Sequence, residues 1–208
     1  MIFGVVSLAA SAGTIFYEEI PGSENLSIRA RRKSISLENE EGLLRELRLA
    51  GSERIVSLCI TPLEREGEQR IIYISGSRFS RYGHTLHVLD SISLEEIYRE
   101  DFAYAKPHKV QAGEVNGDGF IDVAITMYKK TEFHPVMAKR PYFYSWKNGR
   151  LEPLWRGSRF AYPFLDFRLE DLDGNGIDEV IVREKIQGGA VREGVYRWQG
   201  FGFVRDED

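Results

Sequence analysis

The sequence predicts an all-β protein: a small β-propeller or a propeller-like array of about four four-stranded antiparallel blades, the first of them incomplete or degenerate. Three observations support this fold class. Aromatic residues, 12% of the chain, fall in short clusters with Val and Ile, as half-buried strands require. An acidic, glycine-containing loop that leads into an apolar strand occurs twice, each time followed by an aromatic hairpin. With a third, eroded copy, the repeat recurs every 52 to 57 residues, about the length of four short strands with their turns.

The composition is that of a globular chain and argues against several classes of function. Of the 208 residues, 42% are hydrophobic, which is enough for one sizeable core or a row of small ones. The net charge is −4, with Lys and Arg interspersed among Asp and Glu, so we expect no nucleic-acid partner. Cys59 is the only cysteine, which excludes an intrachain disulfide and predicts a buried small hydrophobe.

The N-terminal segment leaves two interpretations open. Residues 1–12 form an apolar run followed by small residues, without a preceding Lys or Arg. This pattern fits either the end of an export signal or an ordinary buried strand. No apolar stretch is long enough to span a bilayer, so we expect no membrane span.

The repeat divides a single propeller-like domain into units at residues 1–54, 55–106, 107–162 and 163–208. The first unit begins with what should be its second strand and lacks an acidic loop, but it has a hairpin from Ser34 with a turn at Gly42. The second unit keeps an eroded loop from Pro62, with Glu64, Glu66 and Gly67, then the strand Ile71–Ile74 and a hairpin from Leu86.

The third and fourth units are the best-matched pair. Their acidic loops begin at Glu114 and Asp171, and each leads into an apolar strand. Their aromatic hairpins begin at Tyr142 and Val195, with glycines at comparable turns. The agreement of both halves of the unit indicates a structural repeat and not a chance motif.

Two segments also carry helix signals. Ser93–Glu96 reads as a capping box, and the leucines of Glu40–Leu49 lie near helical spacing. Both segments fall where the repeat requires a strand. We therefore predict strands in both places.

The two acidic loops have the spacing of a calcium site. Ca²⁺ binds six to eight oxygens, and alternate residues of a tight loop can direct their oxygens to one point while glycine allows the sharp turn. The predicted ligands, at loop positions one, three, five, seven (by its carbonyl) and nine, are Glu114, Asn116, Asp118, Phe120 and Asp122 in one loop and Asp171, Asp173, Asn175, Ile177 and Glu179 in the other. An EF-hand is excluded, because Ile125 and Val182 stand where its bidentate glutamate should be. The alternative is that these residues form tight turns without metal.

These loops resemble the D-x-D-x-D-G-x-x-D element of the FG-GAP or VCBS repeat, found in integrin-type and bacterial extracellular β-propellers. The resemblance covers roughly residues 55–208. It implies a propeller with calcium at the blade corners, acting outside the cytoplasm mostly as a binding platform. Glu114 and Glu179 depart from the shorter Asp of the pattern. We expect calcium to bind better at the Asp171 loop than at the Glu114 loop.

A second candidate site is the basic stretch Lys129–Pro141, predicted to be a long loop inserted between two strands. Loops on a rigid scaffold often carry binding residues, and a basic, aromatic-flanked loop suits an anionic sugar, a carboxylate or an acidic protein surface. The predicted ligand-binding residues are His134, Lys139, Arg140, Trp146 and Trp155. The alternative is a solvated loop whose charges keep a strand edge soluble.

The function expected from the sequence is a non-catalytic, calcium-stabilised binding module that recognises a protein or glycan partner outside the cytoplasm. No catalytic residues are predicted, because the sequence contains no G-x-S-x-G element and its four histidines form no metal-binding motif. One alternative is a polysaccharide lyase or glycoside hydrolase on a propeller scaffold, since a glycosidase needs only two acids from distant strands. The other is a structural fragment of a larger adhesin-type propeller.

Overall fold

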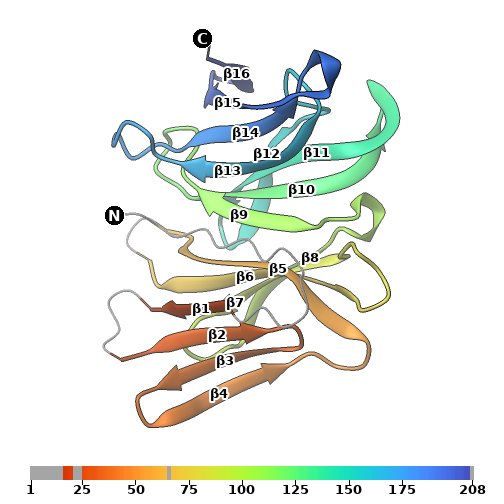
Figure 1. Cartoon of the computed structure of the whole chain (residues 1–208). Helices are drawn as coiled ribbons and strands as arrows, with labels where there is room; N and C mark the ends of the chain where they lie inside the picture. Colours follow the sequence, from red (N-terminus) through yellow and green to blue (C-terminus); the bar gives the residue numbers. More distant parts are fainter. Residues whose placement is uncertain (1–15, 21–24, 65–66, 207–208) are drawn as a thin grey trace. The chain divides into compact units, whose positions relative to one another are not determined.

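The computed structural model describes residues 16–20, 25–64 and 67–206, and this part of the chain is built from β-strands (Figure 1). Sixteen strands, β1 to β16, and two short 3₁₀ helices, η1 (Ala103–Ala105) and η2 (Gln187–Gly189), account for its regular structure. No helix among these residues is long and apolar enough to cross a membrane. The all-β prediction is confirmed.

The strands form four separate antiparallel sheets, each of four strands that are neighbours in chain order. The first sheet contains β1 (Phe16–Glu19), β2 (Ser27–Arg31), β3 (Ser34–Asn39) and β4 (Gly42–Arg48). The second contains β5 (Glu53–Pro62), β6 (Gln69–Ser77), β7 (Thr85–Asp90) and β8 (Glu96–Asp101). The third contains β9 (Lys109–Gly113), β10 (Asp122–Thr131), β11 (His134–Lys147) and β12 (Arg150–Arg156). The fourth contains β13 (Phe164–Glu170), β14 (Glu179–Lys185), β15 (Val191–Trp198) and β16 (Phe203–Arg205).

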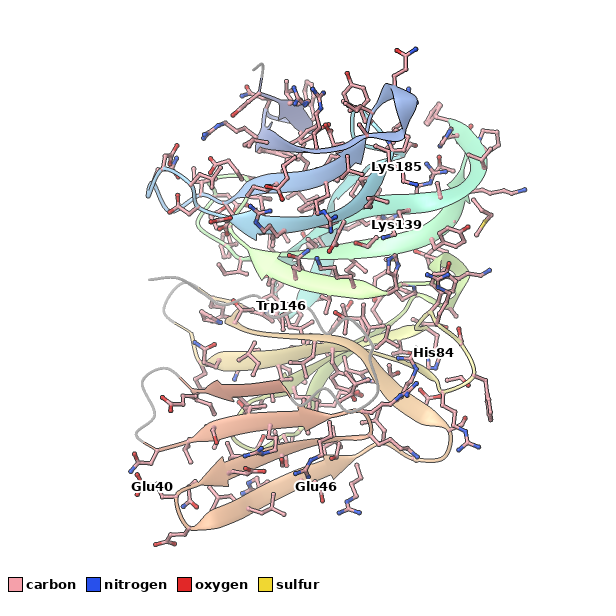
Figure 2. All side chains as sticks on the ribbon, in the orientation of Figure 1. Glu40, Glu46, His84, Lys139, Trp146 and Lys185 are labelled. Atoms are coloured by element: carbon pink, nitrogen blue, oxygen red, sulfur yellow. The ribbon has the colours of Figure 1, made fainter. Side chains whose placement is uncertain are left out.

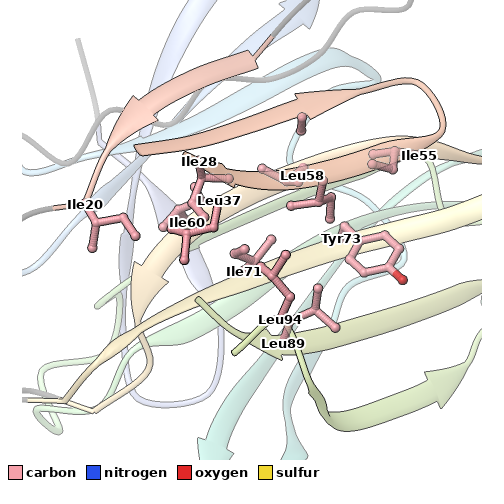
Figure 3. Packing of buried hydrophobic residues seen from close by; sticks show 12 residues of the cluster. Ile20, Ile28, Leu37, Ile55, Leu58, Ile60, Ile71, Tyr73, Leu89 and Leu94 are labelled. Carbon is pink, nitrogen blue, oxygen red and sulfur yellow. The ribbon is translucent and has the colours of Figure 1, made fainter. Parts of the chain in front are cut away.

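The chain divides into two compact units, Met1–Val110 and Gln111–Asp208. In the first unit, alternate side chains of β2 and β3 meet side chains of β5 and β6 in one apolar cluster (Figure 3). Cys59 is buried in β5, as predicted. The core of this unit therefore comes from two sheets that each present one apolar face, as strand periodicity requires.

The second unit has an aromatic core. Phe143 of β11 lies against Phe167 of β13, with ring centroids 5.8 Å apart, and against Phe203 of β16, at 4.5 Å. Trp155 and Phe160 complete the cluster, with ring centroids 5.9 Å apart. The aromatic hairpins that mark the repeat in the sequence thus supply the packing of this unit.

The turn between β11 and β12 shows how local sequence sets register. Asn148 and Gly149 both have positive φ, 52° and 72°. A two-residue hairpin turn of this kind matches the twist of the strands, and Asn-Gly is its preferred sequence. The predicted turn at Gly149 is confirmed.

Neither segment with helix signals is a helix: the strand predicted at Glu40–Leu49 is confirmed, whereas the strand predicted at Ser93–Glu96 is wrong, because most of that segment is a turn. Gly42–Arg48 is β4, and β8 begins at Glu96 after a turn. In that turn the Asp90 carboxylate accepts the N–H groups of Ile92 and Ser93, so Ser93 belongs to a turn and not to a helix cap. Strand pairing in the sheet outweighs the local helix preference.

The prediction of an incomplete first unit is wrong, because Phe16–Arg48 already supplies four paired strands. Residues 1–12, predicted to be an export signal or a strand, lie outside the described residues. Glu66 of the eroded loop also lies outside them. None of the four sheets closes on itself within the described part of the chain. The propeller therefore stays a prediction.

Candidate functional site

The two acidic loops are neighbours in the second unit (Figure 1). Residues 114–122 join β9 to β10, and residues 171–179 join β13 to β14. The N–H of Asp178 donates to the carbonyl of Glu114 at 2.5 Å, which ties one loop to the base of the other. Two motifs 57 residues apart in the sequence are thus brought together.

The first acid of each loop organises the turn. The Glu114 carboxylate accepts the N–H groups of Asn116, Gly117 and Gly119. Asp171 accepts the N–H groups of Gly174, Asn175 and Gly176, of which the two glycines correspond to Gly117 and Gly119. These hydrogen bonds, that of the Gly176 N–H most of all, hold the pKa of Asp171 below its ordinary value.

The loop glycines have similar backbone conformations in the two loops. Gly117 and Gly119 have φ of 78° and 84°, and Gly174 and Gly176 have φ of 74° and 84°. Side chains with a Cβ rarely adopt these values, so glycine is required at both positions of both loops. The two loops therefore share left-handed backbone at their fourth and sixth positions.

The ninth positions are buried but compensated differently. Asp122 is fully buried; Ser145 Oγ donates to its Oδ1 at 2.6 Å and the N–H of Val115 donates to its Oδ2 at 3.3 Å. Burial raises the pKa of Asp122 to about 7, against these hydrogen bonds. Glu179, 2% exposed, accepts the N–H of Leu172 and pairs with Arg197.

Cations lie beside the acids of both loops. Lys147 Nζ is 2.9 Å from Asp118 Oδ2 at the rim of the first loop. Arg197 Nη1 is 3.1 Å from Asp173 Oδ2 and also contacts Glu179 Oε1 in the second. The acids at positions three and nine of the Asp171 loop therefore already share a positive group.

The seventh positions donate hydrogen bonds within the loops. The N–H of Phe120 donates to Asp118 Oδ1 at 3.0 Å, and the N–H of Ile177 donates to Asn175 Oδ1 at 2.7 Å.

In the described ranges, no three His, Cys, Asp or Glu side chains are arranged to hold a metal ion. In the Asp171 loop, Arg197 contacts two of the predicted ligands, Asp173 and Glu179; calcium in either loop stays a prediction.

Asp178 belongs to this acidic region and was not predicted from the sequence. Its side chain packs on Gly113, where any Cβ would collide with it. Burial raises the pKa of Asp178 to about 6, and the charges of Asp171, Glu179 and Glu114 add to the shift. Motif spacing gives no signal for this residue, because its importance comes from contact between the two loops.

The basic stretch Lys129–Pro141 is not an inserted loop, contrary to the prediction. It is part of the hairpin of β10 and β11, whose turn contains only Glu132 and Phe133. The register is interrupted once: Lys129 pairs with Ala138, whereas Thr131 pairs with His134. The residues 135–137 therefore bulge from the ladder opposite a single residue.

Arg140 fills this bulge. Its side chain is fully buried and donates to the carbonyls of Lys129 at 3.0 Å, His134 at 3.1 Å and Val136 at 2.5 Å. It also contacts the His134 ring and the carbonyl of Ser158. Arg140 thus satisfies carbonyls that the bulge releases, and the prediction that it contacts a ligand is corrected to a structural role.

The five predicted ligand-binding residues do not form one site. His134 begins β11 and Trp146 lies near its end, twelve residues on, which corresponds to roughly 40 Å of extended strand. Figure 2 shows Lys139 and Trp146 at separate places, and Trp146 is buried. Trp155 packs in the aromatic core, and Lys139 donates to the carbonyl of Leu165.

The exposed part of the hairpin, residues 130–137, is called the hairpin tip below. Phe133 is 88% exposed, and Val136 and Met137 are exposed beside it. Lys130 is exposed next to them, and Glu132 is the acid in this segment. The tip presents apolar side chains between cationic neighbours, whereas the sequence analysis predicted binding by basic residues together with Trp146 and Trp155.

A hydrogen-bonded chain of three polar side chains in the second sheet was also missed. Ser75 Oγ lies 3.0 Å from His87 Nε2, and His87 Nδ1 lies 2.5 Å from Glu96 Oε2. The Tyr73 ring stacks on His87, with centroids 4.5 Å apart. The three groups come from β6, β7 and β8, so only strand pairing brings them together, in the order of atoms that serine hydrolases use.

Neither a scan against models of protein families nor a search among characterised proteins gives a match to this chain. The resemblance to the FG-GAP or VCBS repeat therefore stays a prediction that rests on the loop residues.

Proposed function

We propose that this protein is a non-catalytic interaction module that binds an acidic protein partner through the hairpin tip. The proposal rests on one observation: the hairpin ends in an exposed aromatic residue, and its base is held by a buried arginine. The scaffold in this proposal is a propeller-like array that acts outside the cytoplasm, as the loop motif implies.

The hairpin tip has the features of a binding anchor. Phe133 projects from a two-residue turn, and aromatic side chains supply much of the binding energy in protein interfaces. Arg140 joins the bulge to Ser158, which limits the motion of the tip. A preorganised tip loses less conformational entropy on binding than a mobile loop would.

Charge selects the kind of partner. Lys129, Lys130 and Lys139 flank the apolar tip, and Glu132 is the acid between them, on a chain of net charge −4. Burial, and then the nearby Arg156, lower the pKa of Lys129; Arg156 adds a further positive charge to the lysines. An acidic surface around an apolar pocket would complement this region, mainly in association rate and specificity.

The burial of individual strands supports the propeller part of the proposal. β9 is buried along its whole length and β5 is buried except at its ends, whereas β8 and most of β4 are exposed. In a propeller, the first strand of each blade lines the axis and the last lies on the rim. Burial falls in that direction from β5 to β8 and from β9 to β12, whereas in the fourth sheet β14 is more buried than β13.

Phage display of random peptides tests the proposal. We expect selected peptides to combine Asp or Glu with apolar residues, and Phe133→Ala to weaken their binding by about tenfold or more. Phe201→Ala is the matched control, because Phe201 is a 92% exposed aromatic in another turn of the same unit. Peptides that bind Phe133→Ala as tightly as the parent would contradict the proposal.

A lipid surface is the other occupant that this chemistry could attract. Vesicles containing phosphatidylserine are therefore assayed with the same two variants. Phe133-dependent binding to vesicles without any Phe133-dependent peptide would replace the protein partner with a membrane.

A further inference from the structure

The two acidic loops carry different side chains at one equivalent position. In the third sheet Asp122, at the ninth loop position, pairs with Ser145 across β10 and β11. In the fourth sheet Glu179 and Arg197 are one step beyond the pair Val180 and Tyr196, and so occupy the corresponding positions. The Glu114 loop therefore has a short acid opposite a hydroxyl, where the Asp171 loop has a long acid opposite a guanidinium.

Arg197 contacts acids on three sides. Its Nη1 reaches Glu179 and Asp173, at loop positions nine and three, and its Nε is 3.0 Å from Asp206 Oδ2. Glu179 is 2% exposed, and a carboxylate taken out of water needs a positive or strongly donating partner. The planar guanidinium can donate to several carboxylates at once.

We infer that the guanidinium of Arg197 takes, in the Asp171–Glu179 loop, the place that a bound cation has in loops of this sequence pattern. It joins the third and ninth positions, which a metal ion would otherwise join, and it neutralises the buried Glu179. This loop therefore keeps its shape without metal. The sequence suggests that calcium binds better at the Asp171 loop than at the Glu114 loop, and the inference reverses that order. The inference does not depend on the hairpin tip.

The exchange of residues accounts for the departure from the usual loop pattern. A Glu at the ninth position is longer than the Asp that the pattern prefers, and here its Oε1 contacts the arginine of the next strand. In the Glu114 loop the ninth position keeps Asp, whose Oδ1 accepts the hydroxyl of Ser145. Acid length and cross-strand partner change together, as a coupled pair should.

The test measures melting temperature in chelator and in calcium. All variants carry Asn116→Ala and Asp118→Ala, which remove the side-chain oxygens at positions three and five of the Glu114 loop, so that any calcium effect reports the Asp171 loop. With Arg197 present, we expect the same melting temperature in both buffers. Arg197→Ser, which copies Ser145, should lose roughly 5 °C in chelator and recover on addition of calcium.

Arg168→Ser is the matched control, because Arg168 is also ion-paired to two acids, Glu170 and Glu193, outside the loop. Its melting temperature should be the same in chelator and calcium. Arg197→Lys keeps the charge and covers the case in which Arg197→Ser does not fold; it should stay insensitive to calcium.

Three results would overturn the inference. The first is a rise in the melting temperature of the Arg197 parent on addition of calcium. The second is an Arg197→Ser variant that is not weakened in chelator, or is weakened and not rescued by calcium. The third is an Arg197→Lys variant whose melting temperature depends on calcium.

Discussion

Asp122 couples the Glu114 loop to pH. Its pKa is raised to about 7 from an ordinary value of 3.8, mainly by burial. Between these values the folded protein holds a proton that the unfolded chain releases, so the free energy of unfolding falls as pH rises. Asp122 therefore opposes folding most strongly above pH 7.

Replacing Asp122 with Asn should remove this dependence. In chelator, we expect the stability difference, Asp122→Asn minus wild type, to grow between pH 4 and pH 8 by up to about 4 kcal/mol. Urea unfolding at several pH values measures it, and a constant loss from altered hydrogen bonds cancels in the comparison. A difference that does not change with pH would contradict the prediction. Calcium bound at this loop would instead favour the ionised carboxylate and flatten the wild-type curve.

Arg140 is buried in the hairpin and donates to carbonyls of its bulge. Arg140→Met fills the same space but leaves the carbonyls of His134, Val136 and Ser158 without this donor. We expect a loss of about 3 kcal/mol or more, since buried carbonyls without partners are costly. Urea unfolding measures the loss, and hydrogen exchange should show lower protection at residues 130–137.

Lys130→Ala is the control for Arg140, because Lys130 is exposed in the same bulge. It should change stability by less than about 0.5 kcal/mol. Equal losses in the two variants would show that the hairpin does not depend on the buried guanidinium.

At the scale of strands, the chain Ser75–His87–Glu96 joins β6, β7 and β8. It has the connectivity of a catalytic relay, but Ser75 is 4% exposed, and a nucleophile must reach its substrate. We therefore predict that it fastens the strands and does not catalyse. A fluorophosphonate probe should leave native Ser75 unlabelled, whereas labelling that disappears in His87→Ala would establish a hydrolase instead.

The edge strands of the sheets bear on whether the protein associates with itself in solution. β4 carries exposed Arg45 and Arg48, and β12 carries exposed Pro153. Charge and proline at an edge hinder pairing with another chain. We predict a monomer by light scattering, and Arg45→Val with Arg48→Val should promote association. A stable oligomer of the wild-type protein would favour the adhesin-fragment alternative.

Much of the fold followed from sequence because its signals are local. Alternation of apolar residues identifies strands, Asn148-Gly149 sets a turn, and the repeat resolves the helix-like segment that becomes β4. The candidate site was predicted less well. Lys129–Pro141 reads as a charged loop, because neither the bulge nor the burial of Arg140 leaves a local signature.

The sequence by itself determined the all-β class, the four strand units and the positive-φ glycines of the two acidic loops, since alternation and glycine φ depend on neighbouring residues. Only the tertiary structure decided which groups meet: Asp178 with the Glu114 loop, and Arg197 with Glu179. The physical reason is that charge compensation and burial depend on separation in space, and strand pairing joins residues that are far apart along the chain.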